Sequence, residues 1–175
     1  MAIKTIFLDR DGVINKEVGY LHKIEDFIFI DGVFEACLSF KQLEYQIIII
    51  SNQSGIARGY FTLFDYEKLT KWMLNQFSKK NISILDVIFC PHGPKSTCSC
   101  RKPKPGMLVD AQNKYNIDLE KSWMIGDKET DIEAANLAGI NNTILLRSGH
   151  LINESNSNAQ FIIDSIKQSK EVIKT

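Results

Sequence analysis

The sequence predicts an α/β fold, a doubly wound parallel sheet formed by a single domain over residues 1–175. Two observations lead to this prediction. Short apolar runs alternate along the chain with longer segments of helical periodicity, which is the pattern of repeated β-α-β units. The chain has 175 residues, about the length of one domain. Because most of the short runs are apolar at nearly every position, we expect helices to cover both faces of the sheet.

Six segments are expected to form the strands. Thr5–Leu8 and Ile47–Ile50 consist of apolar and β-branched residues, which favour buried parallel strands. The other four expected strands run over residues 86–89, 122–125, 143–146 and 161–163.

Helical patterns lie between these runs. Thr62 is followed three residues later by Asp65, the spacing of a capping box, so a helix is expected to begin there. Leu69, Met73 and Phe77 then repeat at helical spacing, which predicts a face packed on the core. Further helices are expected over residues 32–43, from Pro105, from Thr130 to about Gly139, and over 165–173. The polar segment 153–160 is expected to be a loop.

Composition excludes several classes of partner. Lys and Arg number 21, Asp and Glu also number 21, and the formal charge is zero, so no basic field is available to hold nucleic acid. The all-aliphatic run Ile47–Ile50 is far shorter than the ~18 residues that a membrane helix needs. The N-terminus reaches the charged Asp9 too early for a signal peptide. We therefore expect a cytoplasmic monomer without nucleic-acid or membrane partners.

Polar residues directly follow several of the predicted strands. Asp9 and Asp11 come after the first strand, Ser51 after the second and Asp127 after the fourth. In a parallel sheet the ligand crevice lies beyond the carboxyl ends of the strands, so these side chains are expected to converge.

Three convergent carboxylates predict a Mg²⁺ site and phosphoryl transfer. Asp and Gly also populate ordinary turns, so the pattern Asp9-x-Asp11-Gly12 alone is weak evidence. Placement at a strand end strengthens it, because repelling carboxylates need a cation or a shared proton there. Hard oxygen ligands and a phosphate oxygen are what Mg²⁺ prefers. One carboxylate can then attack phosphorus while the second transfers protons.

Four potential zinc ligands lie close together in the sequence: Cys90, His92, Cys98 and Cys100. The spacing of one residue within each pair is narrower than in common zinc fingers. The alternative is a set of reduced thiols beside a surface histidine. Because four protein ligands leave no position for water, a bound zinc ion is expected to be structural.

Four sequence blocks resemble the haloacid dehalogenase superfamily of phosphatases. They read FLDRDGVIN over residues 7–15, SNQSGIARG over 51–59, CSCRKPKPGM over 98–107 and MIGDK over 124–128. The last two blocks are similar to the subgroup of D-glycero-D-manno-heptose 1,7-bisphosphate 7-phosphatases and histidinol phosphatases. Long blocks in the same order are far more specific than one short motif. The resemblance implies a Rossmann-like sheet of the haloacid dehalogenase type with a zinc-binding loop.

The resemblance also implies a role for each matching residue. Asp9 is the nucleophile, Asp11 the general acid and base, and Ser51 and Lys102 stabilise the transferring phosphoryl group. Mg²⁺ is held by Asp9, Asp11 and Asp127, and Zn²⁺ by the four cysteine and histidine ligands named above. The implied substrate-binding residues are Glu17, Val18, Gly19, Tyr20, Ser51, Asn52, Gln53, Ser54, Arg101, Lys102 and Lys128. Lys104 is a rival for the phosphate-binding lysine, although a solvated surface role is favoured for it.

The implied activity is hydrolysis of the 7-phosphate of a heptose bisphosphate, in nucleotide-activated heptose and lipopolysaccharide biosynthesis. Histidinol phosphate is the alternative substrate. A phospho-accepting signalling domain shares clustered aspartates, but Asp11 argues against it because activating water shortens the life of the phosphoenzyme. A zinc-dependent binding module with a decayed site has no support, since every expected catalytic residue is present. No large insertion interrupts the chain, so the enzyme is expected to be capless.

Overall fold

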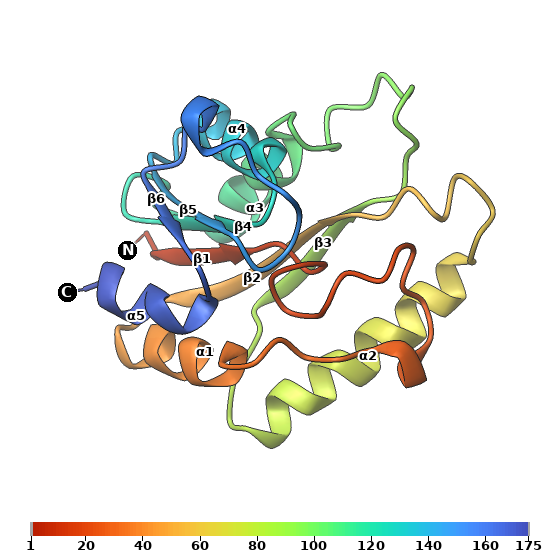
Figure 1. Ribbon diagram of the computed structural model, residues 1–175, viewed down its shortest axis with the longest axis horizontal. Coiled ribbons are helices and arrows are strands. Elements are labelled where there is room, and N and C mark those ends of the chain that lie inside the picture. The colour runs from red at the N-terminus through yellow and green to blue at the C-terminus, as the bar shows by residue number, and fades with distance from the viewer. Residues whose placement is uncertain (1, 175) are drawn as a thin grey trace.

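The computed structural model describes residues 2–174 and contains one sheet of six strands. All neighbouring strands are parallel, in the order β3-β2-β1-β4-β5-β6 (Figure 1). The strands are β1 (Thr5–Leu8), β2 (Gln46–Asn52), β3 (Asp86–Cys90), β4 (Trp123–Gly126), β5 (Asn142–Leu146) and β6 (Phe161–Ile163). The predicted parallel sheet is therefore confirmed, and all six expected strands form.

Helices cover both faces of the sheet, so the fold is doubly wound as predicted. The helices are α1 (Val33–Gln42), α2 (Leu63–Lys79), α3 (Gly106–Tyr115), α4 (Glu129–Ala138) and α5 (Ser169–Val172). In Figure 1, α1, α2 and α5 lie on one side of the sheet and α3 and α4 on the other. The reversal of strand order between β1 and β4 places a crevice at the carboxyl ends of these two central strands.

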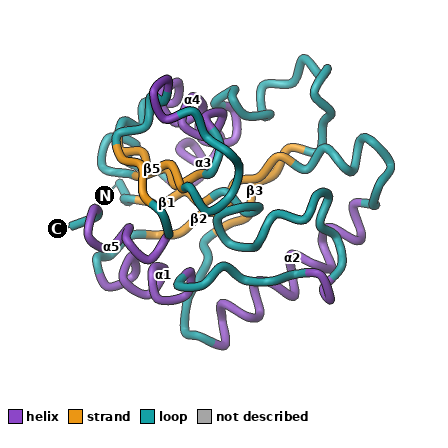
Figure 2. The backbone as a smooth tube through the Cα atoms, in the orientation of Figure 1, coloured by secondary structure: helices purple, strands orange, loops and turns teal. Residues whose placement is uncertain are grey.

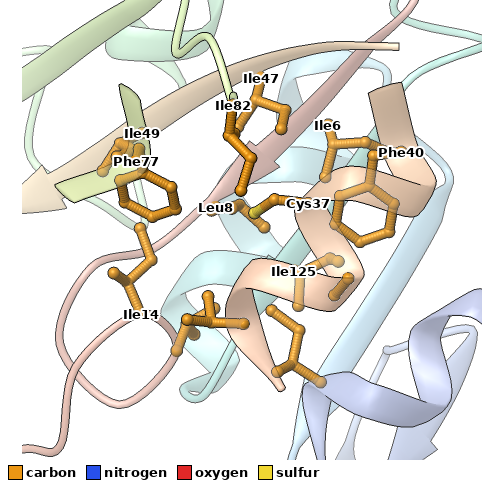
Figure 3. Packing of buried hydrophobic residues seen from close by; sticks show 14 of the residues in the cluster. Ile6, Leu8, Ile14, Cys37, Phe40, Ile47, Ile49, Phe77, Ile82 and Ile125 are labelled. Atoms are coloured by element: carbon orange, nitrogen blue, oxygen red, sulfur yellow. The ribbon is translucent and has the colours of Figure 1, made fainter. Parts of the chain in front are cut away.

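Two hydrophobic clusters, one on each face, hold the sheet rigid. Ile6 and Leu8 of β1 belong to the cluster beneath α1 and α2, which also contains Phe40 and Phe77 (Figure 3). Phe7, between them in sequence, points to the opposite face and joins the cluster beneath α3 and α4. Ile6, Phe7 and Leu8 are all fully buried, so β1 fixes the position of the residues that follow it.

The capping box predicted at Thr62 is present at the start of α2. Thr62 Oγ1 accepts a hydrogen bond from the Asp65 main-chain N–H at 3.1 Å, and Asp65 Oδ2 accepts one from the Thr62 N–H at 2.9 Å. Two N–H groups that the helix itself cannot satisfy are thereby bonded. The stripe Leu69, Met73 and Phe77 is buried, as predicted.

The chain after β6 differs from the prediction. A single helix over residues 165–173 is wrong: a 3₁₀ turn at Ile166–Gln168 precedes the four-residue α5. Ser165 Oγ caps the turn, and Ser169 Oγ donates to the Ile166 carbonyl at 2.6 Å, which favours the tighter winding. The expected loop 153–160 also contains a 3₁₀ turn, Glu154–Asn156, where Glu154 pairs with Arg147 at 2.6 Å.

The loops that follow β1, β2 and β3 extend beyond the same end of the sheet (Figure 2). Each of these loops leads directly to a helix, α1, α2 or α3, without adding a strand to the sheet. The only helical segment within them, all of whose residues the structure describes, is the 3₁₀ turn Ile24–Asp26. Within residues 2–174 nothing folds as a separate lid over this end, in line with the capless expectation. No helix in the same range is both long and apolar enough to cross a membrane.

Candidate active site

Asp9 stands directly after β1, at the carboxyl end of the most central part of the sheet. Its side chain is buried, and the main chain turns sharply at Gly12, where φ is +87°. A Cβ atom at Gly12 would lie 2.1 Å from Asp127 Oδ2. Glycine is therefore required there both for the positive φ and for the close approach of the β1 loop to Asp127.

Lys102 brings its ammonium group into this buried site. Its Nζ lies 2.9 Å from Asp9 Oδ1, 2.6 Å from Asp131 Oδ1 and 3.1 Å from the Ile50 carbonyl oxygen. Burial by itself lowers the pKa of the Lys102 ammonium, but Asp131 and Asp9 outweigh burial and raise the pKa. The lysine is thus held as a cation against the nucleophile candidate.

Asp127 follows β4 and is fully buried. Its Oδ2 accepts hydrogen bonds from the His150 main-chain N–H at 3.1 Å and from the His150 ring at 2.6 Å. Its Oδ1 is buried and finds no hydrogen-bond partner among the described residues. An unpartnered buried carboxylate oxygen is costly unless something else binds it. Asp127 Oδ1 is therefore available for a cation.

Asp9, Asp127 and Asp131 form a carboxylate cluster, with one oxygen of each within 4.8 Å of the others. Burial raises the pKa of Asp9 well above its usual range; Lys102 opposes the rise, and the neighbouring carboxylates Asp131 and Asp127 add to it. Burial likewise raises the pKa of Asp127. Three buried acids with a single ammonium group between them leave an excess of negative charge, so this carboxylate cluster suits a divalent cation.

Asp11 lies in the same cavity but outside the carboxylate cluster. Its Oδ1 accepts from Arg10 Nη2 at 2.9 Å and from Asn15 Nδ2 at 3.0 Å, and its Oδ2 accepts from Gln53 Nε2 at 3.0 Å. Burial raises the pKa of the Asp11 carboxyl, but the charge and hydrogen bonds of Arg10, with those of Asn15 and Gln53, outweigh it and lower the pKa. The carboxylate is held ionised and in one orientation.

Ser51 ends the buried part of β2 beside these acids. Gln53 Nε2 donates to Ser51 Oγ at 2.6 Å as well as to Asp11 Oδ2. Gln53 thereby links the two side chains. The Ser51 hydroxyl keeps its own proton to donate toward the cavity.

A cavity of about 530 Å³ opens over these groups. Asp9, Asp11, Ser51, Lys102 and Asp131 line its floor. Ten of the eleven residues expected to bind substrate line it too: Glu17, Gly19, Tyr20, Ser51, Asn52, Gln53, Ser54, Arg101, Lys102 and Lys128. The exception is Val18, which is 51% exposed and lines a neighbouring hollow instead.

The four predicted zinc ligands converge beyond the end of β3. Cys90 Sγ lies 3.1 Å from Cys100 Sγ and 3.7 Å from Cys98 Sγ, and His92 Nδ1 lies 3.3 Å from Cys100 Sγ. Two sulfurs bound at about 2.3 Å to one tetrahedral zinc ion stand roughly 3.8 Å apart. The separation of 3.7 Å matches the edge of such a tetrahedron, and that of 3.1 Å is shorter. The ligand types and their convergence within 4.8 Å make this zinc-ligand cluster suitable for Zn²⁺.

The two cations next to the zinc-ligand cluster have different partners. Arg101 Nη1 donates to the His92 carbonyl at 3.2 Å, and the side chain reaches the cavity. Lys104 Nζ donates to the Cys98 carbonyl at 2.6 Å, away from the carboxylate cluster. Of the two rival lysines, Lys102 is therefore the one that reaches Asp9.

The sequence interpretation missed two residues of this site. Asp131 lies in the first turn of α4, four residues after Asp127, and its place just beyond the end of β4 was the available signal. Its Oδ2 also accepts from the Asp127 and Lys128 main-chain N–H groups, at 3.2 and 3.1 Å. His150 also belongs to the site, and no local sequence pattern indicates its contact with Asp127, 23 residues away.

Comparisons with known proteins agree with this geometry. A model of the HAD-hydrolase-like family matches residues 99–169. A D-glycero-beta-D-manno-heptose-1,7-bisphosphate 7-phosphatase of Photorhabdus laumondii subsp. laumondii is 44% identical over 99% of this chain and 96% of its own length. A D-glycero-alpha-D-manno-heptose-1,7-bisphosphate 7-phosphatase of the same organism is 48% identical over 90% of this chain and 90% of its own length.

Solved structures give the same result. The crystal structure of a D,D-heptose 1,7-bisphosphate phosphatase from B. bronchiseptica, complexed with magnesium and phosphate, superposes with a TM-score of 0.84. It is 28% identical in sequence, and the match covers 97% of both chains. The chain therefore belongs to the haloacid dehalogenase-like hydrolases and, within them, to the family of the D-glycero-D-manno-heptose-1,7-bisphosphate 7-phosphatases.

Proposed function

We propose that this protein hydrolyses the 7-phosphate of a D-glycero-D-manno-heptose 1,7-bisphosphate through an aspartyl-phosphate intermediate. The observation that carries the proposal is the placement of Lys102 Nζ between Asp9 and Asp131, at 2.9 and 2.6 Å, in the cavity that Asp11 and Ser51 also line. The relatives named for this activity cover nearly the whole chain. Neither histidinol phosphate hydrolysis nor a signalling role is favoured by them.

Asp9 is the proposed nucleophile. Its buried carboxylate is held at the end of a rigid strand, so it is already in position and needs little motion to attack phosphorus. Its Oδ1 is bonded to Lys102, so Oδ2 is the oxygen left to attack. Attack would break the bond between phosphorus and O7 of the sugar and form the aspartyl phosphate.

Asp11 is the proposed general acid and base. In the first step it gives a proton to the departing O7 atom, and in the second it removes one from the attacking water. Its lowered pKa suits the second step directly. For the first step it must carry a proton, which the negative charge of a bound phosphate would favour by raising its pKa.

Ser51 and Lys102 are proposed to stabilise the oxygens of the transferring phosphoryl group. Phosphoryl transfer depends mainly on positioning and on neutralising the charge of these oxygens. A hydroxyl and an ammonium group fixed in the same cavity as the attacking carboxylate provide both without reorganising during the reaction.

A magnesium ion would be held by Asp9, Asp127 and Asp131. The unpartnered Oδ1 of Asp127 and the convergence of the three carboxylates support this assignment. When bound, the ion would neutralise negative charge on the phosphate and on the carboxylates. Asp11 was also expected at the metal; its side chain is directed to Arg10, Asn15 and Gln53, so its part in metal binding stays a prediction.

A zinc ion held by Cys90, His92, Cys98 and Cys100 would have a structural role. These four residues, whose ligand atoms lie within 4.8 Å of one another, would fill all four positions of a tetrahedral ion. The chain continues directly from Cys100 into Arg101 and Lys102, so fixing the loop also fixes two cations of the cavity.

The other end of the substrate is proposed to lie against the rim of the cavity. Arg101 and Lys128 provide positive charge for the 1-phosphate, and Glu17 and Tyr20 provide polar groups for the sugar.

All these groups come from one sheet and its loops, so we propose that residues 1–175 act as a single domain. We also propose that the protein is monomeric and works in the cytoplasm, where its four unpaired cysteines would stay reduced.

The proposal is tested by phosphate release from three substrates. Relatives are named for both anomers, so the α- and β-heptose bisphosphates are compared with histidinol phosphate, with Mg²⁺ present or chelated. The expected result is Mg²⁺-dependent hydrolysis of a heptose bisphosphate, with heptose 1-phosphate as product, at a kcat/KM well above that for histidinol phosphate. Asp9→Asn should be inactive and the exposed Asp110→Asn fully active; preference for histidinol phosphate would contradict the proposal.

A further inference from the structure

The side chain of Asn52 is bonded to the main chain of Lys102. Asn52 Oδ1 accepts a hydrogen bond from the Lys102 N–H at 3.0 Å, and Asn52 Nδ2 donates one to the Lys102 carbonyl oxygen at 3.1 Å. A single amide group therefore satisfies both main-chain polar groups of the lysine. The two residues are 50 positions apart in the chain.

Strand β2 contacts both the main chain of Lys102 and the ammonium group at the end of its side chain. Asn52, the last residue of β2, binds the main chain, while the carbonyl oxygen of Ile50, two residues earlier, accepts from Nζ. The same Nζ lies between Asp9 and Asp131. The position of the ammonium group thus depends on where the main chain of Lys102 is anchored to the sheet.

That anchor matters because Lys102 lies in neither a helix nor a strand. It belongs to the segment between β3 and α3, which also carries the zinc-ligand cluster. Of the neighbouring hydrogen bonds, the one from the Lys104 N–H to the Arg101 carbonyl stays within this segment, and the one from the Gly106 N–H to the Ser99 carbonyl reaches only the first residue of α3. The hydrogen bonds from Asn52 join the main chain of Lys102 to the sheet.

We propose that Asn52 is a positioning residue that acts through Lys102, and that its main role is not to bind substrate. The inference rests on the proposed phosphatase function and deepens it. The sequence had suggested a substrate contact for Asn52, and the side chain does line the cavity. Its two hydrogen bonds to Lys102, however, occupy one oxygen lone pair and one N–H, leaving one lone pair and one N–H for any other partner.

The expected consequence is a loss in turnover that depends on the reacting phosphate alone. Displacing a catalytic group by about 1 Å costs on the order of 100-fold in rate. We expect Asn52→Ala and the isosteric Asn52→Asp to lower kcat by ~10- to 100-fold, with KM changed by less than about threefold. Asn52→Asp keeps the acceptor for the Lys102 N–H but turns an oxygen toward the Lys102 carbonyl. The loss should be similar for heptose 1,7-bisphosphate and for p-nitrophenyl phosphate.

A double-mutant cycle with Lys102→Met distinguishes an effect of Asn52 that acts through Lys102 from an independent contact with the substrate. If Asn52 acts through Lys102, then Asn52→Ala should have almost no further effect on kcat once the ammonium group has been removed. An independent contact with substrate would give a full additional loss. Asn113→Asp, on the exposed face of α3, makes the same chemical change away from the cavity and should leave kcat and KM unchanged.

A readout without substrate tests the anchor itself. Lys102 is 3% exposed in its side chain, so acetic anhydride should acetylate it far more slowly than Lys121, which is 74% exposed. In both Asn52 variants the acetylation of Lys102, measured by mass spectrometry with Lys121 as internal reference, should become faster. Zinc content and Tm measured on the same samples show that the variants are folded.

The outcomes are distinct. A kcat loss shared by both substrates, absent in the Lys102→Met background and accompanied by faster acetylation, supports the proposal. A loss confined to KM or to the bisphosphate, an additive double variant, or an unchanged kcat overturns it. If the wild-type protein hydrolyses p-nitrophenyl phosphate but not the bisphosphate, the proposed function fails, and Asn52 is still judged by the first substrate and by acetylation.

Discussion

Lys102 Nζ lies 2.9 Å from Asp9 Oδ1, joining residues that are 93 positions apart in the chain. Asp9 follows a central strand, whereas Lys102 comes from a loop that the zinc-ligand cluster shapes. Lys102 is the cation paired with Asp9 and also with Asp131, at 2.9 and 2.6 Å. The side chains of Lys102 and Asp9 are almost fully buried. The catalytic proposal and the stability of this end of the sheet therefore depend on the same contact.

Lys102→Met should lower kcat by about 100-fold or more, because the charge that stabilises the transferring phosphoryl group is removed. It should also reduce the free energy of unfolding by roughly 3–5 kcal/mol, the usual effect of breaking a buried ion pair from one side. Steady-state kinetics and urea unfolding measure the two effects. Lys104→Met is the matched control on the same loop and should retain near-wild-type kcat; a large loss there instead would make Lys104 the phosphate-binding lysine.

Asp131→Asn should weaken magnesium binding. The amide oxygen of asparagine still accepts from the Asp127 and Lys128 N–H groups, but the charge that faces Lys102 and the carboxylate cluster is lost. The Mg²⁺ concentration for half-maximal activity should rise by ~10- to 100-fold, as a magnesium titration of kcat/KM would show. Glu133→Gln, an exposed acid on the same helix, should leave this concentration unchanged. An unchanged magnesium requirement in Asp131→Asn would remove Asp131 from the site.

Cys98→Ser should abolish stoichiometric zinc binding. Structural zinc contributes its binding free energy to folding, so Tm is expected to fall by about 10 °C, equivalent to roughly 3 kcal/mol. Elemental analysis and thermal unfolding check the two effects. Cys37→Ala is the control for zinc content, because Cys37 lies on the buried face of α1 and burial raises the pKa of its thiol to about 12. Zinc at wild-type content in Cys98→Ser would contradict the four-ligand assignment.

Arg101→Ala should impair binding of bisphosphates selectively. One N–H of Arg101 bonds to the His92 carbonyl, and the residue lines the cavity; its planar guanidinium group has further donors suited to a phosphate. Losing a charge-assisted contact costs ~1.5–3 kcal/mol, or roughly tenfold to over a hundredfold. The loss should appear mainly in KM for the bisphosphate and hardly at all for a monophosphate.

The matched control for that experiment is Arg147→Ala. The Arg147 guanidinium pairs with Glu154 and Asp164 outside the cavity, so neither substrate should be affected. Zinc content of the Arg101 variant is measured as well, because its bond to His92 touches the zinc-ligand cluster. Equal losses on both substrates would mean that Arg101 serves the reacting phosphate or the structure of the loop.

Sequence patterns predicted most of the fold because the six strands are short, apolar and bounded by polar residues. β1 and β6 have the predicted bounds, and the capping box placed the start of α2 correctly. The failure after β6 has a local cause: serine hydroxyls at positions 165 and 169 bond to nearby main-chain groups and tighten the winding into a 3₁₀ turn. Apolar periodicity does not register such bonds.

The site was predictable where its residues directly follow a strand or repeat a family motif. Asp9, Ser51 and Asp127 stand at strand ends, and their convergence follows from parallel topology alone. His150 and the bond between Asn52 and Lys102 were not predicted, because both depend on how loops distant in sequence fold back over the sheet. Asp131 was missed although it lies only four residues after Asp127, because its role is evident only once Lys102 is placed beside it. Such contacts are a property of the tertiary structure.

The most direct test of the proposed mechanism is to trap the phosphoenzyme. Asp11→Asn protein, slowed in the hydrolysis step, is mixed with heptose 1,7-bisphosphate carrying phosphorus-32 in the 7-phosphate, quenched in acid and digested for mass spectrometry. The account predicts that the label appears on the peptide containing Asp9, is released by hydroxylamine, and is absent from the Asp9→Asn, Asp11→Asn double variant. Label on another residue, or no label while phosphate is still released, would contradict it.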